Sequence, residues 1–199
     1  MVQQKSKLIS LNRGDILLII DLQNDFLPGG TLAVSLGDQV VSAMNRYIEL
    51  FQRQQLPIVA TRDWHPADHC SFKAQGGPWP EHCVAGTEGA EFSADLQLPE
   101  TAEIVSKGFN NKAPGYSGFE DTGLGTLLIR LDARRLFIGG LATDYCVLNT
   151  VLDARARHYP VFLLKDAIRA VDVSPHNGHN AIDTMTQEGA IPITLADLQ

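Results

Sequence analysis

The stretch that decides the fold is Ile16-Leu17-Leu18-Ile19-Ile20, followed directly by Asp21. An unbroken apolar run has no face to turn toward water, so it is typical of a strand that is covered on both sides in a parallel sheet. We therefore expect residues 16–20 to form a buried strand that ends at an acidic residue.

The next segments indicate a helix and a second strand. Between residues 37 and 55 the apolar side chains recur with the period of a helix and fall on one side: Val40, Met44, Tyr47, Ile48 and Phe51. Residues 57–61 are typical of a short strand that runs into Arg62 and Asp63. Strand, helix and strand in this order form one right-handed crossover unit.

The same alternation continues to the end of the chain. We expect strands at 103–106, 136–138, 161–164 and 191–194, and helices at 123–132, 144–157 and 178–188. Gly189 is expected to cap the last helix. Strands that alternate with helices predict an α/β fold. The prediction is one domain over residues 1–199, with a mostly parallel sheet of five or six strands and helices on both faces.

Two loops break the alternation. Residues 64–100 are rich in Pro, Gly, His and Trp without a sustained period, and residues 109–122 are rich in glycine and aromatic side chains. A loop as long as the first is usually functional or disordered in a compact domain, and its Trp and His content favours function.

Composition and charge narrow the classes of function. The chain has 199 residues, of which 44% are hydrophobic, and a formal net charge of −7. An acidic chain without a basic stripe binds nucleic acid and anionic membranes poorly, so we expect a small-molecule substrate and neither of those partners. A homo-oligomer is compatible with the sequence. No apolar run approaches a membrane span, and residues 1–15 lack the apolar core of a signal peptide and are typical of a lead-in to the first strand. We therefore expect a cytoplasmic protein.

Polar side chains follow the strands at one edge of the predicted sheet. The first strand ends at Asp21, the second at Asp63 and the third at Lys107, and the fourth leads through two glycines to Cys146. Open α/β sheets bind ligands outside the carboxyl ends of their strands. Two acids, a lysine and a thiol are therefore expected to meet at this edge.

Cys146 is the candidate nucleophile of this group. Thr143 or Asp144 can cap the helix that follows, which places Cys146 in its first turn, where free amides and the helix dipole should lower the pKa of the thiol. The alternative is a small residue that packs helix against sheet. Cys70 and Cys83 lie in the long loop without a helix start, and an odd count of three cysteines argues against a disulfide framework.

The partners of the thiol have alternative readings as well. Asp21 could act as a base, bind a metal ion or only shape a turn. Lys107 could be an ordinary solvated lysine, or it could hold a buried carboxylate and a thiol as anions and so raise the reactivity of the thiol.

A metal site is indicated by Asp63-Trp64-His65, because alternate residues at a strand end face one way. His82, from the distant part of the loop, would supply a third ligand and leave further positions open. Two histidines and one carboxylate suit one divalent metal ion: zinc, iron or manganese. Loop histidines are more often simply solvated, and Asp-x-His alone is a weak signal.

Several motifs resemble a known family. They are Asp21-Leu22-Gln23-Asn24-Asp25-Phe26, Arg62-Asp63-Trp64-His65-Pro66, Trp79-Pro80-Glu81-His82-Cys83, Lys107-Gly108 and Ala142-Thr143-Asp144-Tyr145-Cys146-Val147. In this order, from about residue 15 to 165, they resemble the nicotinamidases of the isochorismatase-like hydrolases. The pair Asp-Trp-His-Pro and Trp-Pro-x-His-Cys is the part that is specific to nicotinamidases.

The resemblance implies a three-layer fold and a metal-dependent hydrolysis of nicotinamide to nicotinic acid and ammonia, with pyrazinamide-like analogues as further substrates. It implies a catalytic triad of Asp21, Lys107 and Cys146, and a metal ion on Asp63, His65 and His82. It also implies an oxyanion hole formed by the Ala142 and Cys146 amides, with a cis peptide before Ala142. Walls for the pyridine ring are implied for Phe26, Trp79 and Tyr116. The position of His69 varies in the family, and only some members use it as a metal ligand, so the resemblance leaves open whether His69 is a further ligand. The position of Tyr145 also varies, and the resemblance assigns it no role.

Other functions of the same fold are less compatible with these residues. Isochorismatases lack the nucleophilic cysteine, whereas this chain has Cys146. N-carbamoyl amidohydrolases lack the metal pattern formed here by Asp63, His65 and His82. A binding module without catalysis would not need the combination of acid, lysine and thiol.

Overall fold

The apolar run forms a central strand of the sheet. In this computed structural model, which describes residues 8–199, β1 spans Asp15–Ile20 and every one of its residues is buried. It pairs in parallel with β2 on one side and with β4 on the other, so that Leu17 faces both Ile58 and Phe137. Residues 1–7 of the expected lead-in lie outside the described part of the chain.

Six strands, all parallel, make up the sheet in the order β3-β2-β1-β4-β5-β6. The other strands are β2 (Ile58–Asp63), β3 (Glu103–Lys107), β4 (Arg135–Leu141), β5 (Val161–Arg169) and β6 (Ile191–Ile193). The predicted fold class is confirmed, with the sheet entirely parallel. β5 runs five residues beyond its expected end at Leu164, and its register with β4 shifts between Ile138 and Gly140.

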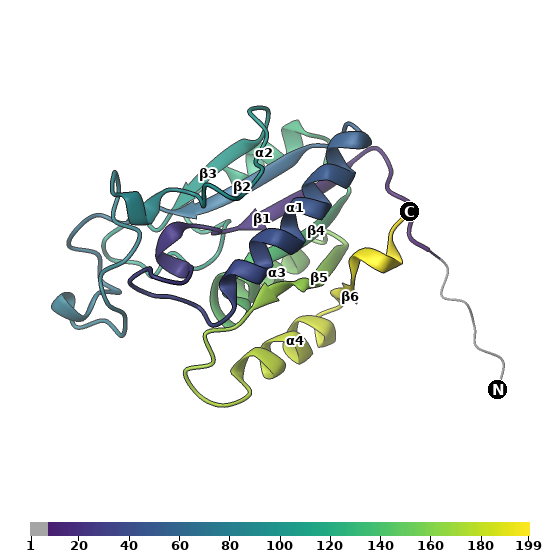
Figure 1. Cartoon of the computed structure of the whole chain (residues 1–199). Helices are drawn as coiled ribbons and strands as arrows, with labels where there is room; N and C mark the ends of the chain where they lie inside the picture. Colours follow the sequence, from purple (N-terminus) through teal and green to yellow (C-terminus); the bar gives the residue numbers. More distant parts are fainter. Residues whose placement is uncertain (1–7) are drawn as a thin grey trace.

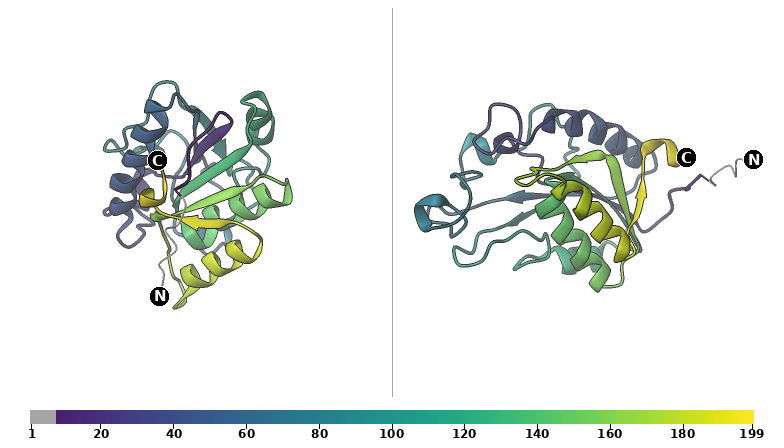
Figure 2. Two further views of the ribbon diagram at one scale, coloured as in Figure 1. Left: turned by 90° about the vertical axis from the view of Figure 1, so that its right-hand side faces the viewer. Right: turned by 90° about the horizontal axis from the view of Figure 1, so that it is seen from below.

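Helices cover both faces of the sheet. α1 (Gly37–Arg53) lies on one face, and α2 (Leu124–Arg130), α3 (Leu148–Ala156) and α4 (Asn177–Gln187) lie on the other (Figures 1 and 2). Side chains of β1 alternate between the two layers: Leu17 and Ile19 pack in the cluster with α1, while Leu18 packs in the cluster with the other helices. Each such side chain contributes about 1.5–3 kcal/mol by leaving water.

The start of the expected helix 144–157 differs from the prediction. Its first turn, Thr143–Val147, is a π-helical turn, and α3 begins only at Leu148. Neither Thr143 nor Asp144 caps this turn with its side chain, so both predicted caps are wrong. The Asp144 carboxylate instead accepts hydrogen bonds from the backbone N–H groups of Val171 and Asp172.

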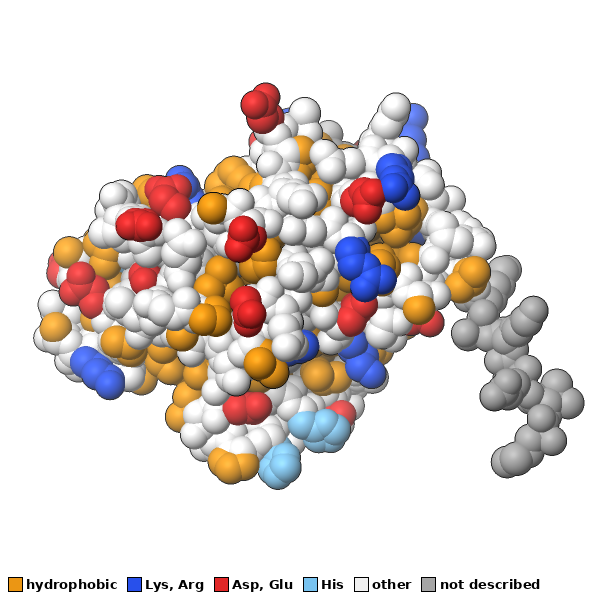
Figure 3. Space-filling view, in the orientation of Figure 1, with side chains coloured by type: hydrophobic (Ala, Val, Ile, Leu, Met, Phe, Trp, Pro, Cys, Tyr) orange, Lys and Arg blue, Asp and Glu red, His pale blue; other side chains and the backbone are white. Residues whose placement is uncertain are grey.

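The long loops gather beyond the carboxyl ends of the strands, away from the C-terminus (Figure 1). Isolated bridges join His65 to Val84 and Phe72 to Trp79, so the loop at 64–100 has a defined path. On the face shown in Figure 3, acidic and basic side chains are interspersed among apolar ones. Within residues 8–199, no helix is both long enough and apolar enough to cross a membrane.

Candidate active site

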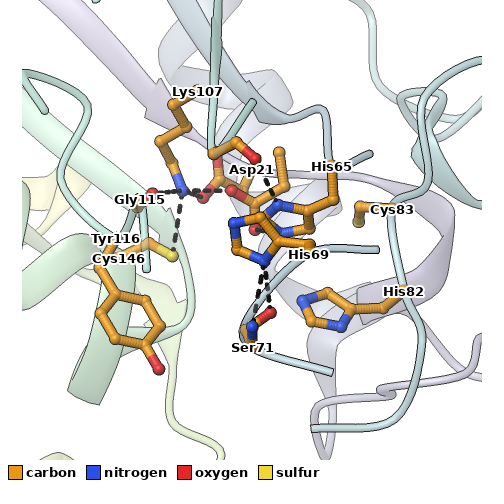
Figure 4. A network of polar contacts seen from close by, with 12 residues as sticks. Asp21, His65, His69, Ser71, His82, Cys83, Lys107, Gly115, Tyr116 and Cys146 are labelled. Carbon is orange, nitrogen blue, oxygen red and sulfur yellow. Dashed lines mark hydrogen bonds and ion pairs between the residues drawn. The ribbon is translucent and has the colours of Figure 1, made fainter. Parts of the chain in front are cut away.

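The carboxyl ends of four neighbouring strands deliver the candidate residues to one place. Asp21 follows β1, Asp63 ends β2 and Lys107 ends β3, while β4 leads through Ala142 into the turn that carries Cys146. All four of the polar side chains are buried. Figure 4 shows the side chains of Asp21, Lys107 and Cys146 turned toward one another, the convergence that the sequence predicted.

Lys107 is the hub of this cluster. Its Nζ lies 2.8 Å from Asp21 Oδ2, 2.5 Å from Asp63 Oδ1 and 3.3 Å from Cys146 Sγ, and it donates to the Gly115 carbonyl at 3.1 Å. The side chain has no exposed surface, so the reading as a solvated lysine is wrong. A single cation thus holds both carboxylates and the thiol together.

Burial dominates the electrostatics of the thiol. It raises the pKa of Cys146 well above the ordinary thiol value, with Lys107 opposing that effect and the carboxylates of Asp21 and Asp63 adding to it. The expected lowering by the helix start is therefore wrong for this structure, because the sulfur is enclosed beside two acids. A thiol in this state needs a base to remove its proton.

The neighbouring charges respond to burial and to one another. Burial raises the pKa of Asp21 above the ordinary carboxyl value, against the effect of Lys107. Burial also acts to lower the pKa of Lys107, but Asp21 and Asp63 outweigh it and hold that pKa well above the ordinary value. Asp21 is therefore suited to accept a proton, while Lys107 stays charged.

Thr61 orients Asp21 and was missed by the sequence analysis. Its hydroxyl donates to Asp21 Oδ1 at 2.6 Å, and both side chains are fully buried. With Oδ2 held by Lys107, the carboxylate is fixed from two sides. The available signal was a hydroxyl residue at the end of the apolar run 57–60, two positions before Asp63.

Three side chains offer a metal site. One ligand atom each of Asp63, His65 and His82 lies within 4.8 Å of the others, and all three residues are buried. The Nδ1 atoms of both histidines lie 2.8 Å from backbone carbonyls, His65 from Gly108 and His82 from Pro80. Those hydrogen bonds require the proton on Nδ1, so that Nε2 is the free nitrogen of the neutral ring, which is the usual orientation of a metal-binding histidine. The donor set therefore fits zinc, iron or manganese.

His69 lies beside these ligands without joining them. Its ring packs against the ring of His65 with centroids 4.0 Å apart, and its Nδ1 lies 2.7 Å from the Ser71 hydroxyl. Burial lowers its pKa to about 4, so the ring is neutral. Its Nε2 has no hydrogen-bond partner among residues 8–199.

Gln23 holds the end of β2 in place and also escaped the sequence analysis. Its Nε2 donates to the carbonyls of Asp63 and Ala90, each at 2.8 Å, and its Oε1 accepts the Asp63 N–H at 2.7 Å. The side chain is fully buried. The signal that could have identified it was its place in the Asp21–Phe26 motif, two residues after the acid that ends the first strand.

A small cavity opens beside the thiol, with a volume of about 30 Å³. It is lined by Phe26, Leu32, Asp63, Trp79, His82, Tyr116, Ala142, Tyr145, Cys146 and Val171. The structure therefore brings the three expected ring walls together. The indole N–H of Trp79 donates to the Tyr116 hydroxyl at 3.0 Å, and the Tyr145 ring meets the Trp79 ring edge-on at 4.9 Å. The peptide before Ala142 is cis, as the resemblance implied.

The fold and this site define a class: a three-layer α/β protein whose reactive groups lie at the carboxyl edge of a parallel sheet. The chain belongs to the isochorismatase domain family, whose model matches residues 15–197.

Its relatives include well-defined enzymes. It is 39% identical over 202 residues to the nicotinamidase of Escherichia coli, covering 91% of this chain and 95% of that protein. The pyrazinamidase of Pyrococcus horikoshii in complex with zinc is 42% identical with a TM-score of 0.87, covering 92% of this chain and 99% of that one. PnC1 from L. infantum, in complex with nicotinate, is 35% identical with a TM-score of 0.89, covering 96% and 98%.

Proposed function

We propose that this protein is a nicotinamidase, which hydrolyses the carboxamide of nicotinamide to nicotinic acid and ammonia through a thioester on Cys146. The observation that carries the proposal is the contact of Lys107 with Asp21, Asp63 and Cys146 at one wall of an aromatic cavity. It joins a nucleophile, its base and a metal-ligand group in one place.

The first half of the reaction forms the thioester. Asp21 takes the proton of the Cys146 thiol as the sulfur attacks the carbonyl carbon of the amide. The N–H groups of Ala142 and Cys146 donate to the oxyanion that develops on the carbonyl oxygen. Asp21 then gives its proton to the departing amide nitrogen, the carbon–nitrogen bond breaks and ammonia leaves.

The second half releases the acid. Asp21 takes a proton from a water molecule that attacks the thioester carbonyl carbon. The carbon–sulfur bond breaks, the thiolate regains the proton from Asp21, and nicotinic acid leaves. Lys107 remains protonated throughout and keeps Asp21 and Cys146 in contact, which is a positioning and electrostatic task.

The rest of the cavity binds the ring. Asp63, His65 and His82 would hold one divalent ion of zinc, iron or manganese, which when bound supplies an anchor for the pyridine nitrogen, directly or through water. Phe26, Trp79 and Tyr116 provide flat apolar walls for the ring. The zinc-bound pyrazinamidase and the nicotinate-bound relative support this arrangement.

An ammonia-release assay on a panel of amides tests the proposal. Nicotinamide and pyrazinamide should be hydrolysed, benzamide should react much more slowly because it lacks the ring nitrogen, and a chelator should reduce turnover. Cys146→Ala should abolish release while the metal stays bound, and Cys70→Ala serves as the matched control that remains active. Equal turnover of benzamide and nicotinamide would overturn the role of the metal, and an active Cys146→Ala variant would overturn the nucleophile.

The panel also separates the rival functions. N-carbamoylsarcosine amidase from Thermoplasma acidophilum shares the fold with a TM-score of 0.76 at 26% identity, so N-carbamoylsarcosine belongs in the panel. If N-carbamoylsarcosine is hydrolysed and nicotinamide is not, the protein acts as a carbamoyl hydrolase. If no amide of the panel is hydrolysed, the result favours a binding module without catalysis. A role in NAD salvage, a cytoplasmic location, a single domain over residues 1–199 and a homo-oligomer remain predictions.

A further inference from the structure

One wall of the cavity comes from a segment outside all the motifs. Val171 lines the cavity with Tyr145 and Cys146, but it lies in the loop between β5 and α4. It is half-buried, and its branched side chain restricts the space at that side of the cavity. Nothing in the roles of Asp21, Lys107 or the metal ligands explains why a wall stands there.

Asp144 ties this wall to the turn that carries the thiol. Its two carboxylate oxygens accept the backbone N–H groups of Val171 at 2.9 Å and of Asp172 at 3.0 Å. Asp144 precedes Cys146 by two residues in the π-helical turn. The position of Val171 is therefore set relative to the nucleophile, across 27 residues of sequence.

The loop is also braced on its far side. Asp172 has φ +53° and accepts the Gly178 N–H at 2.8 Å. A Cβ at Gly178 would lie 2.5 Å from the Ala170 side chain, so the close approach requires glycine there. Because these contacts hold the loop on both sides, moving Val171 away from the cavity costs more free energy than the same movement in a loop without them.

We propose that Val171 is a specificity-determining wall that limits the cavity to an unsubstituted ring, and that Asp144 is the positioning residue that holds this wall against the nucleophile turn. The identity of the ring rests on the proposed function, whereas the wall itself does not. Adding or removing one methyl group in an apolar site changes the discrimination between two substrates by about 10–200-fold. A single valine side chain is therefore large enough to discriminate against a ring that carries an extra methyl group.

Substitutions at Val171 test the wall by size. Val171→Ala should raise the ratio of kcat/KM for 5-methyl- or 6-methylnicotinamide over kcat/KM for nicotinamide by about tenfold or more. Val171→Leu should lower kcat/KM for nicotinamide itself, since the larger side chain enters the cavity. The matched control is Val173→Ala, two residues further on and 63% exposed, which should change neither quantity. If Val171→Ala changes the ratio for both methyl isomers by less than about twofold, the wall is refuted.

Asp144→Asn tests the positioning role. The substitution keeps one acceptor oxygen and removes the other, which costs about 1 kcal/mol. Because the lost hydrogen bond positions Val171 and does not involve the thiol, KM for nicotinamide should rise about fivefold while kcat stays within about twofold. A fall in kcat with KM unchanged would overturn the assignment, because it would place Asp144 with the reacting groups.

A readout without amide hydrolysis separates this inference from the proposed function. Alkylation of Cys146 by iodoacetamide and by a bulky N-aryl iodoacetamide can be followed peptide by peptide, with Cys146→Ser as the blank. Val171→Ala should speed the bulky reagent selectively, even if nicotinamide proves not to be the substrate. Equal acceleration of both reagents would mean general loosening and would overturn the wall.

Discussion

Lys107→Met removes the buried cation and keeps much of the length and apolar volume of the side chain. In the folded protein it leaves the carboxylates of Asp21 and Asp63 facing each other and the thiol, without the group that holds all three. We expect this change to destabilise the fold as well as abolish hydrolysis.

The magnitude follows from the burial of the pair. Removing one partner of a buried ion pair costs about 3–5 kcal/mol, because the other charge is left without compensation. Lys107 has two such partners, both less than 6% exposed, so the upper part of that range applies. A domain has about 5–15 kcal/mol of stability in total. With an m-value of about 2 kcal/mol/M in urea, the midpoint should fall by about 2–2.5 M.

The loss should depend on pH in a definite direction. In the wild type Lys107 and His65 outweigh the effect of burial and hold the pKa of Asp63 well below its ordinary value, so its contribution is present above the unfolded pKa of about 3.9 and is lost as pH falls. In the variant, burial and mutual repulsion raise the folded-state pKa of Asp21 and Asp63 above that unfolded value. The resulting penalty is absent below about pH 4 and grows as pH rises, so the two proteins should differ more at about pH 7.5 than at about pH 5.

Urea unfolding followed by tryptophan fluorescence measures this difference, with chelator present for both proteins. Lys73→Met is the control, since Lys73 is exposed, and it should match the wild type at both pH values. The reasoning is wrong if Lys107→Met is within about 1 kcal/mol of the wild type at about pH 7.5, or if the difference grows toward low pH.

Three further variants test the surroundings of the thiol. His82→Ala removes one of three ligand groups and should weaken zinc binding at least about tenfold in equilibrium dialysis. Tyr116→Phe removes the acceptor of the Trp79 N–H, a loss of about 0.5–1.5 kcal/mol, and should raise KM for nicotinamide about two- to tenfold. Gln23→Leu leaves the Asp63 N–H and two carbonyls unpaired and should lower Tm by several degrees, at about 2–4 °C per kcal/mol.

Each of these has an outcome that contradicts it. Unchanged zinc affinity in His82→Ala would remove that residue from the site. An unchanged KM in Tyr116→Phe would make its hydrogen bond irrelevant to the ring. For Gln23→Leu the control is Gln75→Leu on the exposed part of the long loop, and equal Tm values for the two variants would deny Gln23 its anchoring role.

Local patterns in the sequence were sufficient to predict the layers of the fold and the convergence of four side chains. A strand formed by an apolar run such as residues 16–20 has to be covered by other elements on both faces. The helical period of residues 37–55 predicts an amphipathic helix that covers one of those faces. Because carboxyl ends of parallel strands share an edge, Asp21, Asp63, Lys107 and Cys146 could be grouped without coordinates.

The tertiary structure decided which partner each of these polar groups takes. Lys107 bridges Asp63 as well as Asp21, Thr61 orients Asp21 across 40 residues, and Asp144 turns from its expected cap to a loop 27 residues away. Capping preferences and helix dipoles are local tendencies worth about 1 kcal/mol, and a buried group that would otherwise lack a partner costs more than that. The thiol shows the same competition: its place in the chain is read from sequence, but its pKa is set by enclosure beside two carboxylates brought there by β1 and β2.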